Sequence, residues 1–373
     1  MAGYKRKTKT ASSKPKKDMR EELTKFFIDE IKSGVVPWSK GRIELGAGVP
    51  TNFNTGKRYR GINALNLMVT GLVNKTTSGY FVTYNQAIAI AGVDKKDPDL
   101  KEKSPLTGQK AVAQVEYWGS ITKDQDGKTW FKYENGKKRT QPTPAEIRAE
   151  KLKQVFFVRY ASVFSFEQMN VDKIPEPWLD RRNMNDKTIN KDIIAGKSDL
   201  ILQENALKMV KGLGVEVVHD KYVDTPHYLP VSDKIVMPPR ENYESDARYY
   251  STLMHEAGHA TGHPSRLNRD SLKDYSVSDE NRAYEELVAE LTGVFMGLEL
   301  GIKTVSSADL GGHASYLKSW GRLLSDDLAS GSCKVLAKAS SDAEKAVDIL
   351  LNGLEQKLEI KKEKAPEEPM LGM

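Results

Sequence analysis

Apolar residues recur at helical spacing in two stretches of the C-terminal half. In residues 246–261 they fall every three or four positions, with Asp246 as a candidate N-cap: Tyr250, Leu253, Met254, Ala257 and Ala260. A second helical pattern runs over about 279–300. We also predict a helix over 198–213, a strand pair near Val215 and Ile235, and mostly helix from there to about residue 358.

The N-terminal half mixes the two kinds of pattern. Helical spacing predicts helices over about 19–33, 61–73 and 83–92. Clusters of β-branched and aromatic residues predict strands over 114–121, around Trp130 and over 155–166. The charged segment 140–153 fits either a helix or a hairpin insertion. The whole chain is therefore expected to be an α+β protein.

Composition divides the chain into five segments. Lys, Ser, Thr and Pro dominate its first residues, and Pro175, Pro177 and a polar run separate the two halves. We expect a disordered basic tail (1–18), a first domain (19–172), a linker (173–195), a second, mostly helical domain (196–358) and a disordered tail (359–373).

Positive charge is concentrated at the front of the chain. The net charge is +6, but residues 1–60 hold 15 Lys and Arg against 6 Asp and Glu. The remainder is slightly acidic, so the asymmetry indicates a polyanionic partner, most often nucleic acid.

Other counts bear on the compartment. The only cysteine is Cys333, so no internal disulfide is possible. No apolar run reaches membrane-spanning length, and no apolar signal core follows the basic start. We expect a cytoplasmic protein without a membrane partner.

The first of the two C-terminal helices contains the motif H-E-x-x-H, from His255 to His259. Residues four apart lie on one face of a helix, so both imidazoles can bind one ion. Glu256 follows the first ligand and can reach water beside that ion. This arrangement is typical of a metal-activated hydrolase.

The second helix offers a third ligand. Glu286 and Glu290 are four apart, on one face, among small residues. Inward-facing acids are costly unless they bind something, and a metal would resolve the cost. The spacing resembles the gluzincin branch of zinc peptidases, which implies that Glu286 is the third ligand and that Glu290 accepts a hydrogen bond from a ligating histidine.

Two other interpretations stay open, and a third, the metzincin site, fails. Glu286 and Glu290 could form a solvated stripe. His263 is a rival ligand, although Gly262 and Pro264 mark the end of the helix there, and it could instead support the site as a polar group near the ligands. A metzincin site would need its third histidine where Ser265 stands.

The first domain interleaves cations with aromatic residues, a pairing that suits single-stranded DNA because cations contact phosphates and rings stack on bases. Glycines near residue 56 would let the backbone approach a ligand. The candidate contacts are Trp38, Lys40, Arg42, Lys57, Arg58, Tyr59, Arg60 and Tyr84.

Several stretches, taken together, resemble the ArdC/TraC-type antirestriction proteins of plasmids and phages. They match in order over residues 36–38, 55–65, 83–87, 163–168, 233–239, 252–269 and 285–290. The resemblance implies an N-terminal ssDNA-binding domain joined to a zincin-like metallopeptidase domain, and a role in protecting incoming DNA during conjugation or phage entry. Ala260 departs from the family pattern, as does an insertion near residues 94–104.

The mechanism we expect uses Zn²⁺, with Mn²⁺ or Co²⁺ as alternatives, held by His255, His259 and Glu286. Glu256 carries the proton, and Tyr284 or Arg266 helps to stabilise the carbonyl oxygen. The protein substrate is unknown. The alternatives are a DNA-shielding protein with a structural metal, an SprT-like protease of DNA–protein crosslinks, and a TraC-like primase accessory.

Overall fold

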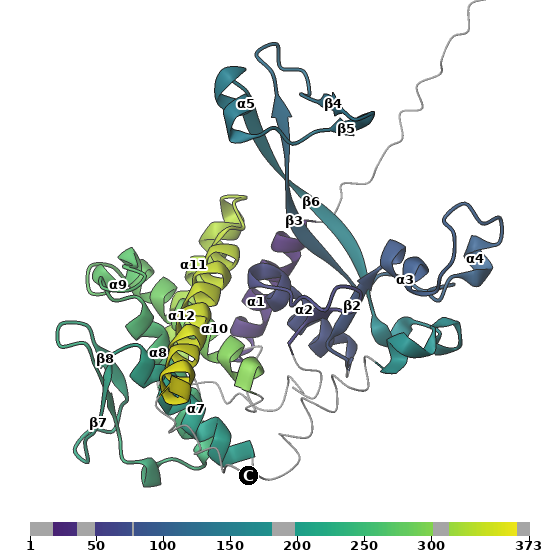
Figure 1. Cartoon of the computed structure of the whole chain (residues 1–373). Helices are drawn as coiled ribbons and strands as arrows, with labels where there is room; N and C mark the ends of the chain where they lie inside the picture. Colours follow the sequence, from purple (N-terminus) through teal and green to yellow (C-terminus); the bar gives the residue numbers. More distant parts are fainter. Residues whose placement is uncertain (1–17, 36–48, 77, 181–197, 301–312, 364–373) are drawn as a thin grey trace, which may run out of the picture.

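The elements of the first half assemble around a four-stranded sheet. A computed structural model describes residues 18–35, 49–76, 78–180, 198–300 and 313–363 (Figure 1). The first half contains α1 (Met19–Lys32), β1 (Thr51–Asn52), α2 (Gly61–Asn74), β2 (Tyr80–Thr83), α3 (Tyr84–Ile90), α4 (Leu100–Lys103), β3 (Ala113–Lys123), β4 (Lys132–Glu134), β5 (Lys137–Arg139), α5 (Pro144–Ala149) and β6 (Lys153–Ser165).

Two strands of this sheet are much longer than the others. The order is β1-β2-β6-β3, with β1 parallel to β2 and the other pairs antiparallel. β3 and β6 stay paired from Ala113↔Val163 to Lys123↔Lys153, whereas β2 reaches only the last residues of β6. Their outer parts therefore leave the body as a hairpin whose end carries β4, β5 and α5 (Figure 1).

Side chains of α2 cover the open edge of this sheet. The amide of Asn63 donates to the Glu116 carbonyl and accepts from the Glu116 N–H, at 2.7 and 2.8 Å. Asn66 donates to the Gln114 carbonyl at 2.9 Å. An unpaired strand edge exposes backbone donors and acceptors, so these two asparagines satisfy the base of the hairpin where no further strand follows.

The second half is mostly helical and carries a small sheet. Its elements are α7 (Ser198–Gly212), β7 (Glu216–His219), β8 (His227–Leu229), β9 (Lys234–Met237), α8 (Asp246–Thr261), α9 (Asp270–Lys273), α10 (Asp279–Leu300), α11 (His313–Ala329) and α12 (Val335–Glu363). The sheet has the order β7-β9-β8, with β7 parallel and β8 antiparallel to β9. Strand β8 is thus an edge strand.

One apolar core crosses the division between the halves. Phe27 of α1 and Leu65 of α2 belong to the same buried cluster as Leu253 of α8 and Leu350 of α12. Helix α1 packs on α11, and α2 packs on α12. A separate, smaller cluster around Phe53 and Phe166 fills the space under the four-stranded sheet. The first two helices therefore belong, in packing terms, to the C-terminal body.

The expected α+β fold is confirmed, and most helices agree with their predictions. Helices α8 and α10 match to the residue, although Ser245, not Asp246, caps α8. The strand predicted around Trp130 is displaced: Thr129 forms an isolated bridge with Lys123, and strand β4 begins at Lys132. The buried Trp130 indole between them donates to Glu150 at 2.7 Å. The pair near Val215 and Ile235 is real but gains a third strand.

The predicted segment boundaries agree with the structure at some positions and differ from it at others. Residues 1–17, 181–195 and 364–373 of the predicted tails and linker lie outside the described residues. Asp18 caps α1, and α12 continues to Glu363, inside the predicted C-terminal tail. Ile174 at the start of the predicted linker is buried in the smaller cluster. Within the described residues, no helix is both long and apolar enough to cross a bilayer.

Candidate metal centre

Helix α8 is buried along nearly its whole length and carries both histidines of the motif. Its N-terminus is fixed by Ser245, whose hydroxyl accepts from the Arg248 N–H at 3.2 Å. The rings of His255 and His259 lie one turn apart with centroids 4.9 Å from each other. Both side chains are buried. The motif thus presents two imidazoles on one side of a fixed helix, as its spacing predicts.

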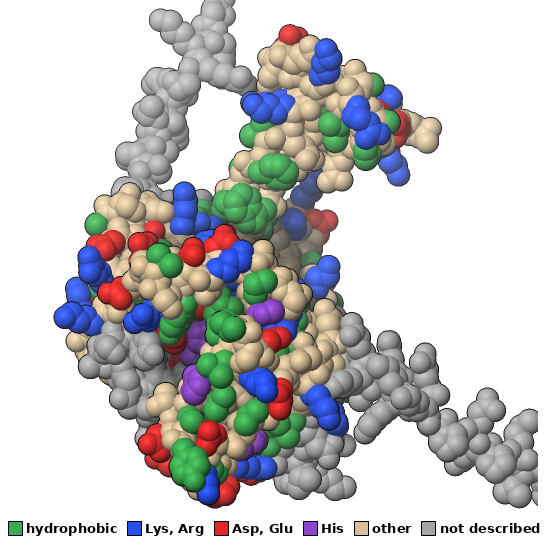
Figure 2. All heavy atoms as spheres, turned by 90° about the vertical axis from the view of Figure 1, so that its left-hand side faces the viewer, with side chains coloured by type: hydrophobic (Ala, Val, Ile, Leu, Met, Phe, Trp, Pro, Cys, Tyr) green, Lys and Arg blue, Asp and Glu red, His purple; other side chains and the backbone are tan. Residues whose placement is uncertain are grey.

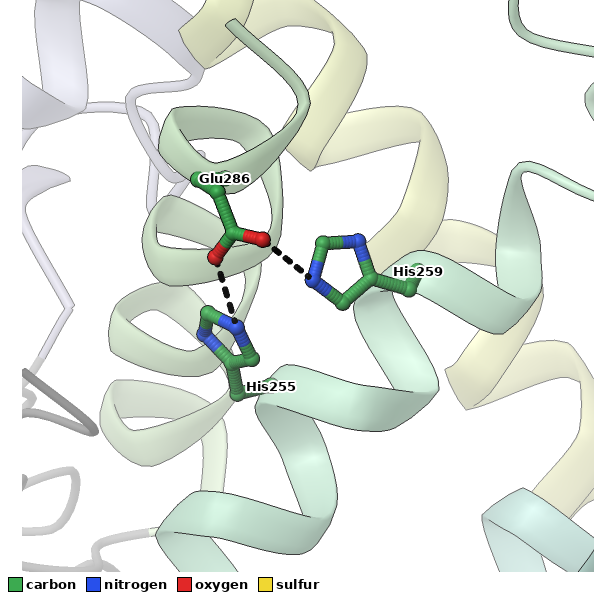
Figure 3. A group of neighbouring side chains, drawn as sticks. All are labelled: His255, His259 and Glu286. Atoms are coloured by element: carbon green, nitrogen blue, oxygen red, sulfur yellow. Dashed lines mark ion pairs between the residues drawn. The ribbon is translucent and has the colours of Figure 1, made fainter. Parts of the chain in front are cut away.

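Glu286 of α10 reaches between the two rings (Figure 3). Its carboxylate oxygens lie 3.4 Å from His255 Nε2 and 3.6 Å from His259 Nε2. One ligand atom from each of the three residues falls within 4.8 Å of the others. Glu286 and Glu290 are both buried, so the hypothesis of a solvated acidic stripe is wrong.

The far side of each ring faces another carboxylate. His255 Nδ1 lies 3.1 Å from Glu290, and His259 Nδ1 lies 3.3 Å from Glu285. A carboxylate on Nδ1 holds the proton there and leaves Nε2 as the ligating atom. Glu290 therefore lies where the sequence places it, next to a histidine and behind the ligand set.

Glu285 was missed by the sequence analysis, together with the arginine that holds it. Glu285 is fully buried and pairs with Arg269, whose guanidinium also donates to the Gly258 carbonyl at 2.7 Å and to the Thr261 hydroxyl at 2.8 Å. The adjacent pair Glu285-Glu286 is the only sequence signal, since neighbouring residues usually face different ways on a helix. Here they meet the same histidine from two sides.

The charges of the cluster stabilise one another. Burial would lower the pKa of His255, but Glu286 and Glu290 raise it well above its usual value. Burial likewise opposes the rise for His259, yet Glu286 and Glu285 bring its pKa to about 9. Burial would raise the pKa of Glu286, but the two imidazoles lower it well below its usual value. Without a metal the site is thus a buried ion-pair cluster.

A cavity of about 760 Å³ opens on the cluster. His255, Glu256, His259 and Glu286 line it, and residues of β8 and the loop after α9 form its rim. Figure 2 shows histidine side chains around this hollow of the helical body. Glu256 therefore faces the same space as the three candidate ligands, as a proton carrier must.

A tyrosine that the sequence analysis did not single out also faces this cavity. Tyr275 donates its hydroxyl hydrogen bond to Glu286, and its ring meets that of His259 edge-on at 6.2 Å between centroids. Tyr275 lies in the loop after α9, where no periodic pattern marks it. Only the three-dimensional contact identifies it as part of the site.

Of three further predicted site residues, two lie away from the cavity and one lines it. The Tyr284 hydroxyl donates to Asp342 of α12 at 2.9 Å, and Tyr284 does not line the cavity. Arg266 pairs with Asp233 and donates to the Ala260 carbonyl at 2.7 Å, also away from the cavity. His263 lines the cavity rim but contacts Ser265 and stands apart from the ligand cluster. Tyr284 and Arg266 therefore hold the fold together and do not face a reacting group.

Three of the predicted DNA contacts also have partners within the fold. Arg58 pairs with Glu299 of α10, and Arg60 pairs with Glu344 at 3.0 Å and Asp348 at 2.6 Å on α12. Both arginines thus tie the first half of the chain to the second. Tyr59 is half-buried, with its hydroxyl accepting from Asn52 at 3.0 Å. These three side chains have structural partners that a phosphate or base would have to displace.

Two of the five remaining candidates are exposed to solvent. Lys57 is exposed, and Tyr84 is exposed at the start of α3. Trp38, Lys40 and Arg42 lie outside the described residues.

Both halves of the chain match known families. Residues 17–164 match the family described as the N-terminal domain of the anti-restriction factor ArdC. Residues 204–332 match the family described as zincin-like metallopeptidase, and this range contains all three candidate ligands.

Curated relatives cover most of this chain. Two Escherichia coli proteins named DNA primase TraC are 33% and 32% identical over 349 residues, or 92% of this chain. The matches span only 20% and 28% of those relatives' own lengths. An uncharacterized protein of Sinorhizobium fredii, y4eC, is 25% identical over 89% of this chain and 91% of its own.

Solved structures of one plasmid protein share the fold. The metal-free crystal structure of the antirestriction protein ArdC from plasmid R388 has a TM-score of 0.62 at 25% identity, covering 91% of this chain and 99% of that one. The Mn(II)-bound form has a TM-score of 0.57, covering 91% and 98%. The chain thus combines a domain that matches the N-terminal domain of the anti-restriction factor ArdC with a zincin-like metallopeptidase domain, and it shares the fold of the R388 ArdC protein over 91% of its length.

Proposed function

We propose that this chain is a zinc-dependent peptidase that also binds single-stranded DNA, in a protein that shields incoming DNA from restriction. The observation that carries the peptidase proposal is the meeting of His255, His259 and Glu286 within 4.8 Å at the floor of a cavity that Glu256 also lines.

The donor set fits a divalent cation. Two imidazole nitrogens and one carboxylate are the ligands of many catalytic zinc sites, and Mn²⁺ or Co²⁺ accepts the same atoms. The buried carboxylates behind both rings add the contacts that usually hold such histidines in one tautomer. The R388 ArdC protein has a Mn(II)-bound form, which also favours a divalent ion here.

The surroundings favour a catalytic over a structural metal. Structural zinc sites usually have four protein ligands, whereas the described residues offer three, on the wall of an open cavity. This argues against the alternative of a purely DNA-shielding protein with a structural metal.

The chain's own residues have these proposed parts. A bound ion would supply Lewis-acid polarisation at the cavity floor. The Glu256 carboxylate accepts a proton from the attacking water and delivers it to the amine that leaves. Tyr275, whose hydroxyl already reaches Glu286, donates a hydrogen bond to the carbonyl oxygen as it gains charge. It takes the place expected for Tyr284 or Arg266.

Polypeptide is the proposed substrate class. The edge strand β8 borders the cavity through His227 and Tyr228. An extended peptide can add to such an edge by main-chain hydrogen bonds, which would lay its backbone across the site. A DNA–protein crosslink would present the same kind of peptide, so an SprT-like activity stays a variant of this proposal.

The nucleic-acid part rests on charge and on the family. The first 60 residues carry 15 Lys and Arg against 6 Asp and Glu, and the R388 relative is an antirestriction protein. A primase role is not proposed, because the relatives of that name extend far beyond the part matched here.

The peptidase proposal is tested with Glu256→Gln, which keeps the side chain's size and removes its ability to accept the proton. We expect cleavage of an unfolded protein substrate to fall by about 10²-fold or more, with metal content unchanged. Glu280→Gln, an exposed acid on α10, is the matched control and should cleave like the wild type. Undiminished cleavage by a metal-loaded Glu256→Gln protein would overturn the proposal.

A further inference from the structure

The hairpin formed by the outer parts of β3 and β6 stands free of the helical body (Figure 1). We call residues 117–159 the arm: a two-stranded shaft and a tip that holds β4, β5 and α5. Figure 2 shows hydrophobic side chains along its shaft and Lys and Arg side chains around its tip. The arm has ten Lys and Arg against five Asp and Glu.

One face of the shaft carries large exposed rings. Trp118 is 67% exposed and Phe156 is 63% exposed. The register pairs Trp118 with Val158 and Ser120 with Phe156, so both rings belong to the same face and lie diagonally across the two strands. The paired strands hold the two rings at a fixed spacing, and both rings face solvent.

The opposite face combines rings with a cation. Tyr117 is exposed and pairs directly with Arg159. The Arg159 guanidinium lies 4.6 Å from the centre of the Phe157 ring. That ring covers Gly119, where a Cβ atom would approach it to 2.4 Å, so Gly119 makes room for an aromatic on the shaft.

The tip repeats the combination. Phe131 and Tyr133 are both exposed and meet edge to face with 5.7 Å between centroids. Lys138 pairs across the hairpin with Tyr133 and places its ammonium 4.1 Å from the centre of the Phe131 ring. Arg139, by contrast, is engaged by Glu134 and Glu146 and shapes the tip. Lys138 and the two rings therefore form a basic and aromatic surface at the far end.

These features favour a nucleic-acid strand over a protein partner. Exposed rings alone would also suit a protein interface, but lysines are depleted at the centres of such interfaces. Exposed rings near cations suit the bases and phosphates of a strand, and stacking requires bases that are not paired in a duplex. The shaft is about 20 to 25 Å long at about 3.3 Å per residue, enough to contact several nucleotides.

We propose that the arm is a binding site for single-stranded nucleic acid, with Trp118, Phe156 and Tyr133 as stacking platforms and Lys138 as a phosphate contact. This inference rests on the proposed DNA binding and changes its location. The contact surface is the free-standing hairpin, and the loop of Arg58 and Arg60 serves as the joint to the helical body.

The experiment uses the full chain and a fluorescently labelled oligothymidine, followed by anisotropy. The variant Trp118→Ala/Phe156→Ala should bind at least about tenfold more weakly, because stacking of each base on a ring contributes substantially. Tyr222→Ala is the matched control: Tyr222 is 83% exposed with Lys221 4.9 Å from its ring centre, but it lies on the C-terminal body. Its affinity should equal that of the wild type.

The outcomes separate the two proposals. If the wild type does not bind the oligonucleotide, the proposed DNA function fails. If the wild type binds and the double variant binds equally well, the arm is not the site. Unchanged thermal unfolding of the variant shows that it is folded, as expected for exposed side chains. If the two substitutions leave DNA binding unchanged but lower the molecular mass of the protein in solution, the surface joins copies of this chain and the inference is wrong.

Discussion

Each histidine of the candidate metal centre lies between two carboxylates, so a metal would have to compete with the protons that these carboxylates stabilise on the rings. The carboxylate behind each ring fixes Nδ1, and Glu286 faces Nε2. The same carboxylates that would orient the ligands also stabilise the protonated imidazoles when no metal is present. Proton and metal therefore compete for the same two imidazoles.

This competition predicts a pH dependence of metal binding. Burial would lower the pKa of His259, but the neighbouring carboxylates raise it to about 9. At pH 7 the metal-free ring therefore carries a proton. Apparent Zn²⁺ affinity should rise about tenfold per pH unit for each proton released, and the part contributed by His259 should level off above pH 9. Competition with a chelator at pH 7, 8 and 9, corrected for the chelator's own protonation, measures it. An affinity that is flat over this range would contradict the proton-loaded cluster.

Tyr275 gives a second prediction for a single side chain. Tyr275→Phe removes only the hydroxyl that reaches Glu286. If that hydroxyl donates to the carbonyl oxygen during peptide cleavage, kcat should fall about 10²-fold while KM and Zn²⁺ content stay close to wild type. Tyr284→Phe, which breaks the contact with Asp342, is the control and should lower stability more than kcat. Equal kcat in Tyr275→Phe and wild type would remove Tyr275 from the mechanism.

The ligands come from two helices, so the distance between α8 and α10 sets the geometry of the metal centre. Gly258 of α8 packs closely against α10: a Cβ there would lie 3.1 Å from the Ala289 Cα and 3.2 Å from its carbonyl oxygen. Gly293 of α10 faces α8 too, but with its nearest atoms at 3.8 Å. Gly258 is required because a methyl group there would press against the backbone of α10, whereas Gly293 has room for a methyl group.

The two glycines make a matched pair of substitutions. Alanine favours a helix over glycine by about 1 kcal/mol at both positions. Gly293→Ala should therefore be neutral or stabilising, whereas Gly258→Ala should be less stable than Gly293→Ala by about 1–3 kcal/mol because the backbone of α10 must move. Gly258→Ala should also weaken Zn²⁺ binding, since Glu286 moves with α10. Urea unfolding and chelator competition test both; equal stabilities would contradict the close crossing.

The helices were predictable because their apolar positions repeat locally, as the exact bounds of α8 and α10 illustrate. The two candidate histidine ligands followed from the motif within that period, and Glu286 followed from the resemblance to gluzincins. The partners of the arginines were not predictable in this way: Arg60 meets Glu344, 284 positions along the chain. A cation beside an aromatic and a glycine has the same local pattern whether it contacts a phosphate or a carboxylate, so only the fold distinguishes the two.

The two halves of the chain are matched by two families but share one core. Leu23 and Phe27 of α1, with Leu65 and Met68 of α2, pack against helices of the C-terminal half. The arm and the sheet extend from this shared body, so the metal centre and the proposed nucleic-acid site are parts of a single folding unit. The predicted division at residues 173–195 separates sequence segments, while the apolar core continues across it.

A fragment that ends at residue 172 tests this view. Burying a large apolar side chain contributes about 1.5–3 kcal/mol, so exposing four of them on α1 and α2 is comparable to the whole net stability of a domain, about 5–15 kcal/mol. We expect the fragment to aggregate or to unfold without a cooperative transition, while the full chain shows α1 and α10 protected together in hydrogen exchange. A soluble fragment with a sharp thermal transition and protected amides in α1 would instead make the N-terminal half independent. The two activities must then be separated by point variants, Glu256→Gln on one side and Trp118→Ala/Phe156→Ala on the other, because cutting the chain removes the core that both sites require.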